Sequence, residues 1–167
     1  LFKDTSTDVL KRLMDVNFWG MVYCTHAAMP YLLQSGGSVV GVSSIAGYKG
    51  LPGRTGYSAS KFAMNGFLDA LRVENLKTGV HIMTACPGFT ASNIRNTALA
   101  KDGSAQGESS MEEEKMMTAG EVARRIADGV ARRTRTLIMT GQGKLTVAFS
   151  KLIPSILDKL VYNVFAK

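Results

Sequence analysis

Apolar and polar positions along the chain fall into two patterns, one typical of helices and one typical of strands. Helical spacing of apolar side chains predicts long helices at residues 7–33 and 58–76. A third helix is expected at residues 119–133, where Thr118 suits an N-cap and Glu121 follows as its capping-box partner. Short, β-branched runs predict three buried strands, at residues 38–43, 80–85 and 136–139.

The predicted order is therefore helix, strand, helix, strand, helix, strand. Such alternation is typical of right-handed crossovers and a parallel sheet covered on both faces. Three strands make a small sheet, so we expect an α/β fold that is only the C-terminal half of a doubly wound, Rossmann-like domain. The chain has 167 residues, 46% of them hydrophobic and 20% charged, which suits a globular domain or part of one and excludes a disordered chain.

The C-terminal segment carries a second apolar pattern beyond the last predicted strand. Apolar side chains recur at helical spacing from Phe149 to Phe165, accompanied by lysines, and Pro154 is expected to kink or restart the helix. The segment is either a helix packed on its own domain, a partner subunit or the substrate entrance, or an interfacial membrane anchor. Packing is the favoured interpretation. Charges interrupt the segment too often for a membrane span.

A long polar stretch at residues 93–117 separates the second strand from the third helix. Connections of that length are typical of a functional lid or of a disordered loop. The acidic run at residues 112–114 is interpreted as solvated surface.

Cysteine and charge usage narrow the function classes. Cys24 and Cys86 have no metal-ligand spacing with either histidine, so we expect no metal and no disulfide, but two buried thiols in a reducing compartment.

The net charge is +7, and residues 121–167 hold nine basic against three acidic residues. That excess suits phosphate groups or an anionic membrane surface, although a solvated helix face is favoured. No nucleic-acid-binding motif occurs, so nucleic acid is not an expected partner. We expect a cytoplasmic protein with possible peripheral membrane contact through residues 145–167.

The chemistry centres on Tyr57 and Lys61. They are four residues apart at the start of a helix and therefore share a face. A cation beside a phenol favours the phenolate and lowers the phenol pKa toward neutrality, and a helix N-terminus acts in the same direction. A general acid/base acting on an alcohol or carbonyl needs such a lowered pKa. Ser44 comes directly after a predicted buried strand, where open parallel sheets place their ligands. Its hydroxyl is suited to donate to a substrate oxygen.

Four motifs resemble the short-chain dehydrogenase/reductase family, in that family's order and spacing. Asn17 lies in the run Asp-Val-Asn-Phe-Trp-Gly and Ser44 in Ser-Ser-Ile-Ala-Gly. The run Tyr-Ser-Ala-Ser-Lys at residues 57–61 follows, and then Pro-Gly-Phe-Thr-Ala-Ser at residues 87–92. The match is firm over residues 15–92 and looser up to residue 140.

The resemblance implies a role for each matched residue. Tyr57 would exchange a proton with the substrate oxygen, and Lys61 would assist it and hold the nicotinamide ribose. Ser44 would polarise the carbonyl, and Asn17 would hold a water that relays protons to Lys61. The residues that would bind the cofactor, NAD or NADP, are Tyr57, Lys61, Pro87, Gly88, Thr90 and Ser92. Ser92 stands where the family usually has Thr.

The chain departs from the family in its N-terminal part. The family's Thr-Gly-x-x-x-Gly-x-Gly turn, which cradles the pyrophosphate, is absent, and so is its Asn-Ala-Gly element. About 100 residues of a typical family domain are missing, judged by domain size. We therefore expect a partial catalytic domain at residues 1–143 with an amphipathic helical tail at 144–167. By itself, this chain should have little activity.

The expected function of the parent protein is an NAD(P)-dependent oxidoreductase that interconverts an alcohol and a ketone or aldehyde. Its expected substrate is a small hydrophobic carbonyl or alcohol compound. The alternative is a non-catalytic dimerisation or binding module built on the same half-domain. A third, minor alternative is a related family that uses the Tyr–Lys pair on nucleotide sugars. The helices at residues 7–33 and 58–76 are expected to pair in a homo-oligomer, because both carry largely apolar surfaces.

Overall fold

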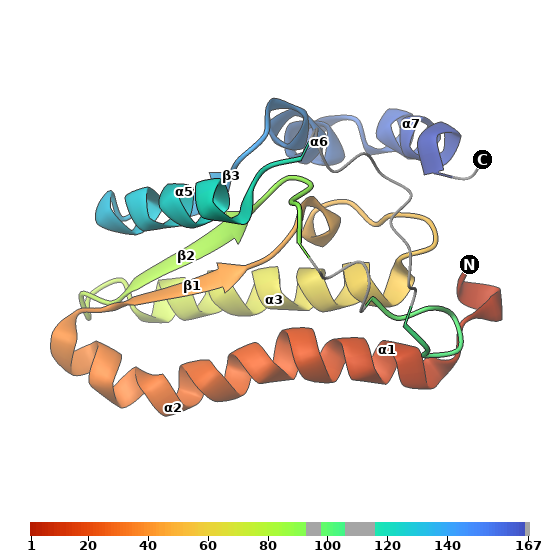
Figure 1. The fold of residues 1–167 in the computed structure, drawn as a ribbon. Coiled ribbons are helices and arrows are strands. Elements are labelled where there is room, and N and C mark those ends of the chain that lie inside the picture. Colours follow the sequence, from red (N-terminus) through yellow and green to blue (C-terminus); the bar gives the residue numbers. More distant parts are fainter. Residues whose placement is uncertain (93–97, 106–115, 166–167) are drawn as a thin grey trace.

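A three-stranded parallel sheet forms the centre of the molecule (Figure 1). The computed structural model describes residues 1–92, 98–105 and 116–165. The strands are β1 (Ser38–Val42), β2 (His81–Cys86) and β3 (Thr136–Ile138), and they lie in the order β1-β2-β3. Ser38 is paired with His81 and Thr84 with Thr136, both in parallel register. The predicted α/β fold with about three parallel strands is confirmed.

Helices cover both faces of this sheet, and a separate apolar cluster fills each face. On one side Val39, Val80 and Ile82 pack with Leu68 of α3 (Thr55–Glu74). On the other side Met83 and Ala85 are buried against side chains of α5 (Ala119–Ala131). Figure 1 shows α5 on this side of the sheet, opposite α3. Neighbouring strand residues point to opposite faces, so β2, which is buried along its whole length, supplies both clusters.

The first predicted helix is interrupted by a wider turn. α1 (Thr7–Met14) passes into a π-helical segment, η2 (Asp15–Trp19), and continues as α2 (Gly20–Ser35). Helical spacing alone gave residues 7–33 as one regular helix. Single π turns inside α-helices are frequent at functional sites, and this one contains Asn17. The helix ends at Gly36, whose φ of 63° is a left-handed conformation that glycine adopts easily.

The second predicted helix begins three residues earlier than expected. α3 starts at Thr55, so Tyr57 already lies in its first turn. The early start is packed against α1, because a Cβ on Gly56 would lie 3.0 Å from side-chain carbons of Leu10 and Leu13. A larger residue at position 56 would therefore push α1 and α3 apart.

The N-cap of α5 is confirmed, but only half of the capping box forms. Thr118 Oγ1 accepts a hydrogen bond from the Glu121 amide at 3.1 Å. The Glu121 carboxylate instead accepts from Arg125 at 2.6 Å, one turn further along the helix. The positively charged guanidinium takes the place of the backbone amide as its partner.

Two helices follow β3 and lie above the carboxyl ends of the strands (Figure 1). α6 (Gly141–Leu152) is capped by Thr140, whose Oγ1 accepts from the Gly143 amide. α7 (Pro154–Phe165) begins at Pro154, which confirms the predicted restart. The expected division between residues 143 and 144 falls inside α6 and remains a prediction. Much of the predicted lid, at residues 93–97 and 106–115, lies outside the described residues, as does the acidic run at 112–114.

One prediction about the thiols is wrong. Cys86 is buried, as expected, but Cys24 is exposed. Cys24 lies on the side of α2 that lines a groove along β1 rather than the packed interior. Both cysteines are free, and the described residues hold no cluster of metal-ligating side chains. Across the same described ranges, no helix has the length and apolar character needed to cross a membrane.

Candidate active site

The carboxyl end of β1 leads directly into the Ser44 turn. Ser43 extends the strand by donating its amide to Ala85 O at 2.8 Å. Ser44 is still extended, and its Oγ accepts from the Ala46 amide at 3.1 Å, which caps the short helix η3 (Ile45–Gly47). A strand end that turns at once into a helical turn holds the Ser44 side chain at the edge of the sheet.

Contacts with α3 hold this turn against the helix that carries Tyr57 and Lys61. Asn65 Nδ2 donates to Gly47 O at 2.8 Å. Gly47 approaches α3 so closely that a Cβ there would lie 2.8 Å from Lys61 O. Further along, the Leu51 amide donates to Ser58 Oγ at 3.2 Å. These contacts place the Ser44 turn beside the first three turns of α3.

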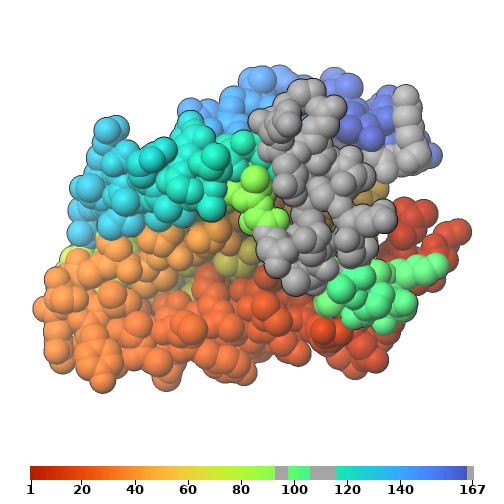
Figure 2. Space-filling model, in the orientation of Figure 1, coloured from red at the N-terminus to blue at the C-terminus, as the bar shows by residue number. Residues whose placement is uncertain are grey.

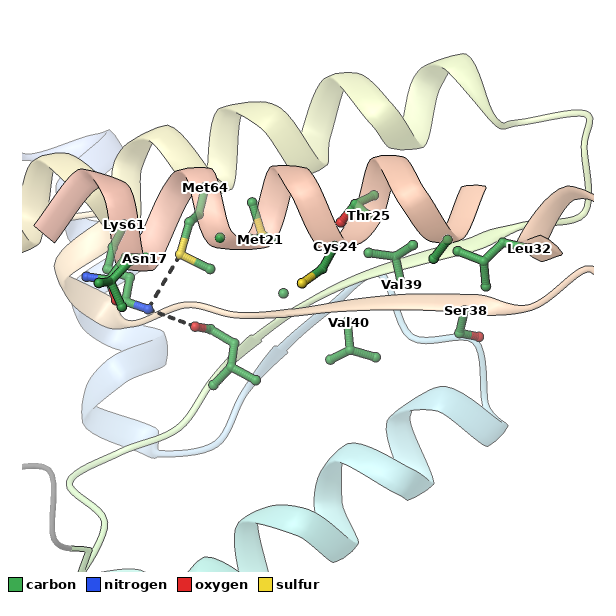
Figure 3. Close-up of a pocket in the computed structure, with 15 residues that line it drawn as sticks. Asn17, Met21, Cys24, Thr25, Leu32, Ser38, Val39, Val40, Lys61 and Met64 are labelled. Carbon is green, nitrogen blue, oxygen red and sulfur yellow. Dashed lines mark hydrogen bonds between the residues drawn. The ribbon is translucent and has the colours of Figure 1, made fainter. Parts of the chain in front are cut away.

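Tyr57 and Lys61 lie on one face of α3, as their spacing predicts. The Lys61 Nζ is 5.7 Å from the centre of the Tyr57 ring. The same nitrogen donates to Val42 O at 2.9 Å and contacts Met64 Sδ at 3.4 Å (Figure 3). Lys61 is only 8% exposed, and burial lowers the pKa of its ammonium group below the ordinary value. An ammonium has three protons to donate, so this one keeps donor capacity for a ligand oxygen.

Asn17 is connected to the Tyr57 backbone through Ser60. Asn17 Nδ2 donates to Ser60 Oγ at 3.0 Å, and Ser60 Oγ donates to Tyr57 O at 2.8 Å. Ser60 is fully buried. The π-helical segment therefore holds its asparagine against the first turn of α3.

A groove of about 520 Å³ runs along β1 and ends at Asn17 and Lys61. α2 forms one wall through side chains such as Met21, Cys24 and Leu32 (Figure 3). The open edge of β1 forms the floor, since β1 pairs only with β2 among the described residues. In Figure 2 the orange atoms around β1 reach the surface between α2 and α5. Nothing in the described structure closes the sheet on this side.

The Pro87–Ser92 run follows β2 at the same end of the sheet. Gly88 is packed against Thr140, where an added Cβ would lie 2.5 Å from the Thr140 methyl carbon. Thr90 Oγ1 donates to Gly88 O at 3.0 Å, and Thr90 forms a parallel bridge with Met117. Pro87 is half-buried and Ser92 is exposed. The Thr90 hydroxyl therefore makes a hydrogen bond within its own turn.

The structure brings Asn17, Tyr57 and Lys61 into one connected group, with the Ser44 turn packed beside it. Sequence reasoning missed the residues that hold this group together, chiefly Ser60, Met64 and Asn65. Their helical spacing from Lys61 offered a signal, since residues three or four positions apart share a helix face. Their partners on distant segments could not be read from that spacing. The catalytic and cofactor roles of the eight predicted site residues remain predictions.

Comparison with known proteins gives the class that this fold and site define. The family model described as short chain dehydrogenase matches residues 1–103. The chain therefore belongs to the short-chain dehydrogenase/reductase family, as the four motifs predicted.

Individual relatives are similar over much of this chain but are longer. "Dehydrogenase/reductase SDR family member 7B" of Mus musculus is 33% identical over 138 residues, covering 82% of this chain and 43% of that protein. "11-beta-hydroxysteroid dehydrogenase 1A" of Arabidopsis thaliana is 33% identical over 157 residues, covering 89% and 44%. The chain thus spans about half the length of the curated relatives it matches.

Solved structures show the same fold. A short chain dehydrogenase from Burkholderia cenocepacia in complex with NADP has a TM-score of 0.71 at 19% identity, covering 93% of this chain and 60% of that one. A short-chain dehydrogenase from Streptomyces avermitilis has a TM-score of 0.70 at 21% identity, covering 99% and 65%. One from Sphingobium yanoikuyae, in complex with NADPH, has a TM-score of 0.68 at 20% identity, covering 90% and 58%.

Proposed function

We propose that the protein containing this chain is an NAD(P)-dependent oxidoreductase that interconverts an alcohol and a ketone or aldehyde. The observation that carries the proposal is the Tyr57–Lys61 pair on one face of α3. Its Lys61 lines the end of the 520 Å³ groove, is buried and can still donate to a ligand. The family assignment supports the same chemistry.

The residues present fit one half of a nicotinamide cofactor. Lys61 places a buried ammonium at the end of the groove, and this donor suits the hydroxyls of a ribose. Pro87, Gly88, Thr90 and Ser92 follow the neighbouring strand and would line the nicotinamide side. When bound, the cofactor supplies or accepts the hydride. The preference between NAD and NADP would depend on residues outside this chain.

The chain's own residues would transfer the proton. In the reductive direction Tyr57 would donate its phenolic proton to the carbonyl oxygen, while the Ser44 hydroxyl donates a hydrogen bond to the same oxygen. Lys61 would stabilise the resulting phenolate. Asn17 would hold a water that returns a proton towards Lys61, and Ser60 fixes the asparagine amide for that role.

The substrate class that suits this site is a small hydrophobic carbonyl or alcohol compound. The apolar groove wall and the exposed apolar helices α6 and α7 near the carboxyl ends of the strands support that class. The chain by itself is proposed to be inactive, because it has no Gly-rich turn for the pyrophosphate.

The test uses the protein extended at its N-terminus by the coding sequence upstream of Leu1. We expect that protein to oxidise NADPH or NADH in the presence of a panel of hydrophobic ketones and aldehydes, followed by coenzyme absorbance. The 167-residue chain should give no turnover in the same assay. Absence of both coenzyme binding and turnover in a folded extended protein would overturn the proposal and favour the non-catalytic binding module.

A further inference from the structure

The helices α6 and α7 carry a set of exposed apolar side chains, here called the α6–α7 face. Five of its side chains are more than half exposed, namely Leu145, Leu152, Ile156, Leu160 and Val164. On α7 the last three recur every four residues, which places them on one side of the helix. So much exposed apolar side chain on two adjacent helices is typical of an interaction surface.

Other residues attach the two helices to the body of the protein. Leu157 is only 6% exposed and packs inward. The Lys49 ammonium forms an ion pair with Asp158. At the start of α6, Gly143 is buried, and a Cβ there would lie 2.8 Å from Ile45 of η3. The helices are thus held in place while their outer sides stay uncovered.

Exposed lysines accompany the α6–α7 face. Lys144 and Lys151 are two turns apart on one side of α6, and Lys159 is one turn after Ile156 on α7. The acidic residue of these two helices is Asp158, and Lys49 already neutralises it. The face therefore combines apolar side chains with a positive charge.

We propose that the α6–α7 face binds the surface of an anionic lipid bilayer, with both helices lying in the interface plane. Apolar side chains inserted at the headgroup boundary, with lysines facing anionic headgroups, are the features of an interfacial helix. Each helix has 12 residues, and α7 starts anew at Pro154, so the pair suits the interface rather than a span. A second copy of the chain fits less well, because two such faces would bring their lysines together.

Binding through the α6–α7 face would bring the candidate site close to the lipid. α6 packs against η3, the turn that directly follows Ser44. A hydrophobic carbonyl compound dissolved in the bilayer could then reach the site without crossing water. This consequence rests on the proposed function, whereas the membrane binding itself does not.

The experiment is flotation of the 167-residue chain with two kinds of vesicle, phosphatidylcholine alone and phosphatidylcholine mixed with phosphatidylserine. The test variant carries Leu152→Ser, Ile156→Ser and Leu160→Ser. Its matched control carries Tyr31→Ser, Leu33→Ser and Leu76→Ser, three exposed apolar residues that lie outside α6 and α7. A charge variant carries Lys144→Gln, Lys151→Gln and Lys159→Gln, with Lys3→Gln, Lys77→Gln and Lys101→Gln as its control. Thermal unfolding checks that each variant folds.

We expect the unmodified chain to float with the anionic vesicles at least about tenfold more strongly than with the neutral ones. The three serines should reduce that binding by about tenfold or more, and the three glutamines should abolish the preference for anionic lipid. Both controls should bind like the unmodified chain. Absence of binding to anionic vesicles, or equal losses in test and control variants, would overturn the proposal. Sedimentation velocity tests whether a second copy of the chain binds the α6–α7 face instead. If the chain self-associates, the three serines abolish this self-association and the chain does not bind lipid, the face is an interface between two copies.

Discussion

Ser60 connects two groups that the proposed reaction needs. Its hydroxyl is fully buried, accepts from the Asn17 amide and donates to the Tyr57 carbonyl. A hydroxyl with both a donor and an acceptor partner fixes the position of each. At the residue scale, the candidate site is therefore held by a side chain that has no proposed contact with substrate.

Replacing Ser60 with Ala should destabilise the fold by about 1–2 kcal/mol, because the half-buried Asn17 amide loses its acceptor. Ser150→Ala is the matched control, since Ser150 Oγ donates to Val147 O at 2.8 Å within its own helix. Urea unfolding of both variants, and of each combined with Asn17→Ala, measures the coupling. A zero coupling energy between positions 17 and 60 would contradict this arrangement.

The Cys86 thiol gives the fold a defined pH dependence. Burial raises the pKa of Cys86 from 9.0 to about 11. The folded state then holds a proton that the unfolded state has lost, so this contribution is complete below pH 9 and is lost as pH rises to 11.

The free energy of unfolding should therefore fall between pH 9 and pH 11 by an amount that Cys86→Ala removes. Two pKa units correspond to about 3 kcal/mol at most. Lys61 has the opposite sign, because burial lowers its pKa and makes its contribution to stability rise with pH. The difference between the two proteins therefore reports Cys86 together with its electrostatic interaction with Lys61. Equal slopes for the unmodified chain and the Cys86→Ala variant, from unfolding curves across this range, would disprove the assignment.

Which residues could be predicted follows from what spacing encodes. Tyr57 and Lys61 are related by one helical turn, so the sequence alone places them on one face. Ser60 and Asn17 are 43 residues apart, and their bond depends on how η2 packs against α3. Cys24 was mispredicted for the same reason, because its exposure depends on the open side of β1 and not on its neighbours in sequence.

At the scale of elements, the edge of β1 is the least complete part of the fold. Val42 is 46% exposed, and the groove runs along the strand past Cys24. An uncovered strand edge offers unpaired backbone groups to another strand. We propose that the segment preceding Leu1 in the extended protein fills this groove.

The reactivity of the Cys24 thiol measures whether the groove is filled. Its thiol should react freely with a maleimide in the 167-residue chain, and at least about tenfold more slowly in the extended protein, where the groove is closed. Cys86→Ala removes the second thiol, and Ser155→Cys in a Cys24→Ser, Cys86→Ala background supplies an exposed thiol that should react equally in both proteins. Equal Cys24 labelling rates in the two proteins would show that the groove stays open.

Element types were predictable because each pattern is local, whereas some boundaries were not. The strands and three helices follow from apolar spacing and β-branched runs. The π turn at Asp15–Trp19 and the early start of α3 depend instead on packing between α1, η2 and α3. Nothing in the periodicity distinguishes a π turn from a regular one.

At the scale of the whole molecule, the paired helices predicted from sequence pack against each other within one chain. α3 still presents an outer stripe that includes Phe62, Gly66, Ala70 and Val73, all exposed. Outside its own helix backbone, none of the described residues lies within 4 Å of a Cβ added to Gly66, so another helix could approach closely there. We propose that this stripe forms the homo-oligomer interface.

Phe62→Glu should weaken self-association of the extended protein by more than about tenfold, because it places a charge in an apolar contact. Phe2→Glu is the control, since Phe2 is also exposed but lies outside the stripe. Sedimentation equilibrium measures both. An unchanged association constant for Phe62→Glu would exclude this interface.

The family and fold class could be read from the sequence because four motifs stand in fixed order. The separate faces of the molecule could not, since the open β1 edge, the α3 stripe and the α6–α7 face appear only when distant segments are packed. The central claim remains the chemistry at Tyr57.

The most direct test is the kcat/KM of the extended protein with its best carbonyl substrate, compared between the unmodified enzyme and Tyr57→Phe. Phenylalanine keeps the ring and removes the proton, so we expect a loss of about 10²–10⁴-fold, the range of general acid–base catalysis. Tyr31→Phe, an exposed tyrosine on α2, should leave the rate unchanged. A Tyr57→Phe enzyme as active as the unmodified one would contradict the account.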